Sequence, residues 1–123
     1  MKEKNLNLCR FIGFEPNPEQ PTSNVWLRTG IEKGFHKFSD MMNITDLHFH
    51  DSYDWLMPLL HDIEKRGCIV EVNYALVITC RICYVGKIQE KSINFYGENS
   101  TIPINAIYDA VTQFVEWYLK NKI

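Results

Sequence analysis

The clearest pattern in the chain is a helical repeat of hydrophobic positions in two stretches, residues 52–66 and 103–120. In the first stretch, hydrophobic side chains recur at i, i+3, i+4 and i+7, at Leu56, Leu59, Leu60 and Ile63. In the second they form a broader face, made of Ile104, Ile107, Ala110, Val111, Phe114, Val115 and Tyr118. This spacing places the apolar residues along one side of a helix, so both stretches are predicted to be helices that pack on a core.

Cap and breaker residues indicate where the first of these helices begins and ends. Ser52 or the residue before it fits the N-cap, and Gly67 is placed to end the helix. Pro58 lies beyond the first turn, where a proline removes one backbone hydrogen bond and kinks a helix. We therefore expect the helix to begin near Tyr53 or Asp54.

Three runs between the two helices alternate hydrophobic and polar residues with a period of two, as strands do. They cover residues 68–74, 76–84 and 92–96. The short connections favour an antiparallel meander, and the middle run is predicted to be the central strand because it is the most apolar.

The N-terminal third of the chain predicts shorter elements. Residues 4–13 fit one short amphipathic helix ending at Gly13, and the proline-rich residues 15–24 fit a loop. Residues 25–28 predict a short strand and residues 30–34 a turn or loop. Residues 38–42 are expected to form one helical turn.

Together these elements predict a single α+β domain over residues 1–123. We expect a layered sandwich: a small, mostly antiparallel sheet of three to four strands, with the two main helices (52–66 and 103–120) packed on it and the short N-terminal helix as a cover. A length of 123 residues supports one hydrophobic core.

Charge and hydropathy disfavour several classes of partner. The net charge is −2 and the isoelectric point is near 6.1, so a nucleic-acid partner or an anionic membrane surface is not expected. The sequence contains neither an apolar run of membrane-spanning length nor a signal-peptide core. We therefore expect a cytoplasmic protein with reduced thiols, and no motif predicts a cofactor.

The cysteines include a C-x-x-C spacing, Cys80 to Cys83, but it lies within a predicted strand. Residues three apart on a strand point to opposite faces, whereas a metal or redox motif needs both sulfurs on one side. Cys9 and Cys68 stand alone, so all four are interpreted as structural free cysteines.

Two histidines are the best candidates for a metal site. His48 and His50 would share one face of an extended segment, and Asp51 follows directly. No third ligand is specified, and the alternative is a polar lead-in to the helix. No Gly-x-Ser-x-Gly motif, phosphate loop or kinase motif is present, so no catalytic residue is assigned and an enzyme is not favoured.

Four aromatic residues are candidates for a protein interface: Trp26, Tyr53, Trp55 and Trp117. Large rings anchor interfaces, but they also form the walls of small cores, and the second interpretation is the simpler one here. Interleaved Lys or Arg would favour stacking on single-stranded nucleic acid, and such residues are absent beside these rings.

Several segments resemble a group of small phage- and mobile-element-encoded proteins from Bacteroidetes, similar to phage ABA-sandwich proteins. The resemblance rests on Phe11-Ile12-Gly13, on the string from Tyr53 to Leu60 that contains Asp54-Trp55-Leu56-Met57-Pro58, on Ala106 to Val111, and on Phe114 to Tyr118. It implies a layered sandwich and no particular activity. Residues 28–38 and the His48/His50 pair depart from the pattern.

These observations lead to two functional hypotheses. The first is a non-catalytic interaction module of phage or mobile-element origin, whose partner is a host or phage protein. The alternative is a small-molecule or metal-binding protein, a hydrolase included, that uses the segment from His48 to Asp54. A homodimer is compatible with either.

Overall fold

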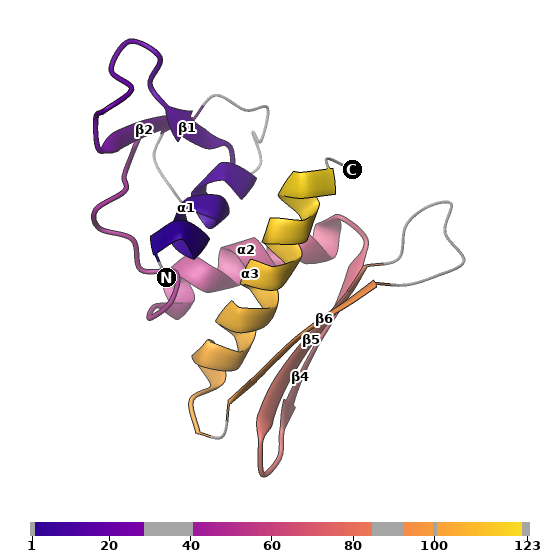
Figure 1. Cartoon of the computed structure of the whole chain (residues 1–123). Helices are drawn as coiled ribbons and strands as arrows, with labels where there is room; N and C mark the ends of the chain where they lie inside the picture. The colour runs from indigo at the N-terminus through magenta and orange to yellow at the C-terminus, as the bar shows by residue number, and fades with distance from the viewer. Residues whose placement is uncertain (1, 29–40, 85–92, 100, 122–123) are drawn as a thin grey trace.

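The computed structural model describes residues 2–28, 41–84, 93–99 and 101–121 (Figure 1). Along the chain it contains α1 (Lys2–Phe11), β1 (Phe14–Pro16), β2 (Val25–Arg28), β3 (Met41–Asn43), α2 (Tyr53–Lys65), β4 (Cys68–Tyr74), β5 (Ile78–Tyr84), β6 (Ile93–Asn99) and α3 (Pro103–Asn121). The predicted α+β class is confirmed.

The described strands form two antiparallel sheets of three, in the orders β1-β2-β3 and β4-β5-β6. The sequence led us to expect one sheet, so the division into two is a correction. Its cause is that the short strands β1 and β3 both pair with β2. Figure 1 shows the helices on one side of the β4–β6 sheet, with β1 and β2 beyond α1, which is a layered arrangement.

The second sheet is the predicted meander, with β5 in the centre. Its inner face is the even-numbered side of β5, where Ile78, Cys80, Ile82 and Tyr84 are buried. α3 packs over β5 and β6, and α2 packs against β4. Strand alternation therefore places the odd-numbered residues of β5 on the opposite, outer face.

Helix α3 approaches β6 very closely at Gly97. A β-carbon at this position would overlap the Ala106 carbonyl oxygen and would lie 2.8 Å from the Ala110 nitrogen. Both atoms are backbone, so a side chain could be accommodated only by moving the helix. Gly97 is therefore what allows α3 to lie directly on the strand.

The ends of α2 agree with the sequence prediction. Ser52 is the N-cap in an extended conformation, although its side chain makes no capping hydrogen bond, and the helix begins at Tyr53. Pro58 is accommodated inside the helix. Gly67 follows the C-cap with φ of 92°, a left-handed conformation that glycine adopts without steric cost.

Two N-terminal predictions need correction. Met41 and Met42, expected in a helical turn over residues 38–42, lie in β3, where Met42 pairs with Trp26. A single helical turn is costly to nucleate, whereas a short strand gains hydrogen bonds from β2. Residues 38–40 and 30–34 lie outside the described residues.

The second correction concerns the loop expected over residues 15–24. Glu15 and Pro16 extend β1 and pair with Leu27 and Trp26. β1 is an edge strand, where proline is tolerated because one side of the strand needs no N–H donor.

An aromatic cluster forms much of the core between α3 and its neighbours. The Phe114 ring is fully buried and lies near several other rings, those of Phe11, Tyr84, Phe95, Trp117 and Tyr118. Among the helices that the structure describes, none has the length and apolarity needed to cross a membrane.

Candidate functional site

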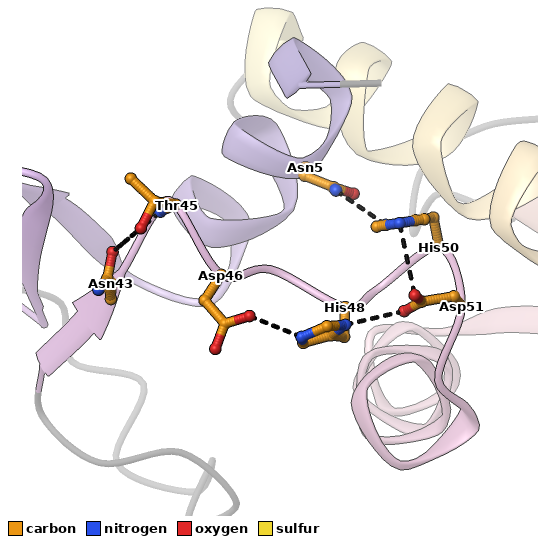
Figure 2. Close-up of polar contacts among 7 residues, drawn as sticks. All are labelled: Asn5, Asn43, Thr45, Asp46, His48, His50 and Asp51. Carbon is orange, nitrogen blue, oxygen red and sulfur yellow. Dashed lines mark hydrogen bonds and ion pairs between the residues drawn. The ribbon is translucent and has the colours of Figure 1, made fainter.

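The predicted histidine segment lies between β3 and α2 and forms a hydrogen-bonded network (Figure 2). His48 Nε2 lies 2.7 Å from the Asp46 Oδ1, and His48 Nδ1 lies 3.1 Å from the Asp51 Oδ1. The hydrogen bond with Asp46, followed by that with Asp51, raises the pKa of His48 above its usual value. Both ring nitrogens are thus occupied by carboxylates of the same segment.

His50 connects this segment to two helices. Its Nδ1 lies 3.2 Å from the Asn5 Nδ2 on α1, and the Tyr108 hydroxyl on α3 donates to the Asn5 Oδ1 at 2.7 Å. Asn5 and Tyr108 are buried, and burial raises the pKa of Tyr108 to about 12. The Tyr108 hydroxyl therefore stays protonated at neutral pH, and the network holds α1, α3 and the histidine segment together.

The three residues named as metal ligands are brought close to one another by Asp51. Its Oδ2 lies 3.7 Å from the His50 Nε2, and its Oδ1 contacts His48. Within the described ranges, however, no group of three or more His, Cys, Asp or Glu side chains is arranged to hold a metal ion. Asp54 is exposed in the first turn of α2, where a negative charge is favoured by the helix dipole.

Two open pockets lie near these elements. One, of about 390 Å³, is lined by residues that include Asn5, Asn24 and Thr45, so it reaches the buried end of the histidine network. A larger one, of about 730 Å³, lies between α1, β1 and α3 and is lined mostly by polar and charged side chains. Either could admit a small polar molecule.

All four cysteines are free and buried, in agreement with the structural interpretation. Burial raises the pKa of Cys9 to about 12 and those of Cys68 and Cys80 to about 11. Because the thiolate is the reactive and metal-binding form, these three thiols are held in the unreactive state at neutral pH. Cys83 pairs with Ile69 and Asn94 in the outer row of the sheet, opposite in direction to Cys80.

The four aromatic interface candidates occupy different environments. Trp26 is buried, with the Arg10 guanidinium 5.2 Å from its ring centre. Trp55 and Trp117 are half-buried and pack against the core, and Tyr53 is exposed. All three tryptophans therefore contribute to the core, and Tyr53 is the most accessible of the four.

A different surface exposes apolar side chains. Helices cover only one face of the β4–β6 sheet in the part of the chain that the structure describes (Figure 1). On the outer face, Ile69 is 53% exposed and Tyr96 is 50% exposed. Between them lies an ion pair in which Arg81 Nη2 is 2.8 Å from the Glu71 Oε1.

The turn between β4 and β5 also exposes apolar side chains. Leu76, in this turn, is almost fully exposed at 96%, and Tyr74, the last residue of β4 on the inner face, is 69% exposed. Sequence reasoning missed this feature because residues 76 and 77 were assigned to the strand. The available signal was the run Ala75-Leu76-Val77, which carries apolar residues where a polar turn is normal.

Comparisons of the chain with protein-family models, with curated proteins and with solved structures gave no match. Function is therefore inferred from the side chains and surfaces described above.

Proposed function

We propose that the protein is a small non-catalytic interaction module that binds another protein through the outer face of the β4–β6 sheet. The observation that carries this proposal is a sheet face that no described helix covers, with Ile69 and Tyr96 exposed on it and Leu76 exposed in the adjoining turn. Apolar side chains grouped on one exposed face commonly mark sites of protein interaction.

The composition of this face suits a protein partner. Tyr96 offers a large ring together with a polar hydroxyl, a combination that is common at interface anchors. Ile69 and Leu76 supply apolar area, and the Glu71–Arg81 pair supplies polar contacts within the same surface. The resemblance to phage and mobile-element proteins suggests a cytoplasmic host or phage protein as the partner.

The test compares capture by the wild-type protein and by surface variants. The double variant Ile69→Ser/Tyr96→Ser removes apolar area from the outer face, and Met41→Ser removes a comparable exposed side chain from β3. A partner captured from a Bacteroidetes lysate should be retained by Met41→Ser and lost by the double variant. Equal recovery with both variants would contradict the assignment of this face.

A second candidate function is the binding of a small molecule or metal by the segment from His48 to Asp54. The observation in its favour is the 390 Å³ pocket, which shares Asn5 with the histidine network. In this alternative His48 and His50 would bind the ligand, and hydrolysis is one chemistry that such a site supports.

Native mass spectrometry of protein purified without chelator or metal-affinity tag separates the two functions. A stoichiometric zinc, manganese or metabolite mass that disappears in His48→Ala would favour the second candidate. A bare protein mass would contradict it and leave the interaction module standing.

A further inference from the structure

The two edge strands of the β4–β6 sheet, β6 and β4, differ in whether side chains hydrogen-bond to their outward backbone groups. On the β6 edge, the Gln113 side chain of α3 donates to the Tyr96 carbonyl at 2.8 Å and accepts from the Tyr96 N–H at 3.5 Å. The side-chain amide thus replaces a neighbouring strand at this residue. For β4, no side chain in the described residues makes a hydrogen bond to the outward backbone groups.

The Gln113 contact also shows which backbone groups of β4 point outward. Because the N–H and C=O of Tyr96 point away from β5, its partner Arg81 must direct its own groups toward β4 and Glu71. Backbone directions alternate along a strand, so Val70 and Val72 direct their N–H and C=O groups away from the sheet. Cys68 and Tyr74 do the same at the strand ends.

β4 carries one charged side chain, Glu71, but lacks the other devices that commonly protect an exposed edge. Its sequence, Cys-Ile-Val-Glu-Val-Asn-Tyr, contains no proline, lysine or glycine, and all seven residues pair in register with β5 without a bulge. A regular seven-residue edge of this kind is a template for the addition of another strand.

The inner-face side chains of β4 are also incompletely covered. Val70 and Val72 are half-buried, and Tyr74 is mostly exposed, whereas their neighbours on β5 are buried. The apolar row of the core therefore continues to the open edge. A strand added there would cover these side chains if it carried apolar residues at the matching positions.

We propose that this edge binds β4 of a second copy of the chain, giving one continuous six-stranded sheet in a twofold-symmetric dimer. This inference goes beyond the proposed function and does not depend on it. In antiparallel self-pairing centred on Val72, the outward N–H and C=O groups of the two Val72 residues form hydrogen bonds with each other. This pairing also places Val70 opposite Tyr74 of the second copy, which completes the apolar row.

The outer face selects this register by charge. Pairing centred on Val72 places Glu71 opposite Asn73 of the second copy, where an amide can donate to the carboxylate. Pairing centred on Glu71 would instead set two carboxylates against each other, which is destabilising. A second copy thus matches the edge in three ways: its backbone groups can form hydrogen bonds, its apolar side chains extend the inner-face row, and its Asn73 faces Glu71.

Charge variants at Asn73 test both the partner and the register by sedimentation velocity over a concentration series. Asn73→Asp places a carboxylate opposite Glu71 at two symmetric positions, so the dimer dissociation constant should rise about fivefold. Asn73→Lys should lower it by a similar factor. The matched controls Asn94→Asp and Asn94→Lys change the same charges on β6 of the same face and should leave the constant unchanged.

A second pair of variants tests the backbone contact. Val72→Pro removes an N–H that the β4–β5 ladder does not use, whereas Val72→Ala shortens the side chain and keeps that N–H. Val72→Pro should be monomeric where Val72→Ala still dimerises. A wild-type protein that stays monomeric at all concentrations, or Asn73 shifts equal to those at Asn94, would overturn the proposal.

Discussion

The β6 and β4 edges belong to the same three-stranded sheet, yet only one is covered in the described structure. At β6, Gly97 lets α3 lie against the strand and Gln113 satisfies the backbone of Tyr96. At β4, no side chain among the described residues makes such hydrogen bonds to the outward groups of Val70 and Val72. The difference indicates that the β6 edge is used for packing within the chain, whereas the β4 edge is available to bind another strand.

The largest expected effect on stability separates the two faces of the sheet, the one covered by helices and the open outer one, and concerns aromatic residues. Phe114 is fully buried on the helix-covered side, so Phe114→Ala should lower the free energy of unfolding by about 4 kcal/mol. Tyr96 lies on the open face, and Tyr96→Ala should cost less than about 1 kcal/mol. Urea denaturation measures both, and similar losses would show that the open face is part of the core.

The close approach of α3 to β6 predicts a large effect at Gly97. Gly97→Ala forces a β-carbon against the backbone of α3 and should cost about 3 kcal/mol. Gly67→Ala is the control, because no atom lies within 4 Å of its added β-carbon and only the left-handed conformation opposes it. Its cost should be about 1 kcal/mol, and equal losses for the two variants would contradict the steric explanation.

Removing the side chain that covers the β6 edge should have a moderate effect on the free energy of unfolding. Gln113→Ala removes two exposed hydrogen bonds to Tyr96 and should cost about 1 kcal/mol. The variant should also exchange its Tyr96 amide proton faster than the wild type. If the exchange rate is unchanged, Gln113 does not protect the β6 edge in solution.

The smallest effect is expected for the ion pair on the open face. Glu71 and Arg81 are both substantially exposed, so solvent screens their charges and the pair should stabilise the fold less than the Gln113 hydrogen bonds do. A double-mutant cycle with Glu71→Gln and Arg81→Met measures this coupling. A coupling as large as the loss of stability in Gln113→Ala would mean that the face is more enclosed than the structure shows.

Periodicity was sufficient to predict the long elements. The helical repeat in residues 52–66 and the alternation in residues 68–74 reflect burial of one face, which sequence records directly. The position of α3 on β6 was harder to predict, because it depends on the close contact of Gly97 with the backbone of α3. Gly97 is an ordinary strand glycine until the helix is placed on it.

The predicted site residues show the same limit. The proximity of His48, His50 and Asp51 follows from their places in the chain, and it was anticipated. The bond from His50 to Asn5, and from Asn5 to Tyr108, joins three segments and was not. Likewise, the exposure of Leu76 depends on where β5 begins, and strand ends are poorly marked by alternation alone.

Backbone hydrogen exchange at two protein concentrations tests the contrast between the two edges most directly. At low concentration, the amides of Val70 and Val72 should exchange rapidly while that of Glu71, bonded to β5, is protected. At high concentration, Val70 and Val72 should become protected with no change at Tyr96. Exchange of Val70 and Val72 that is equally fast at both concentrations, or protection that is already complete at the lower one, would contradict an open edge that pairs with a second copy.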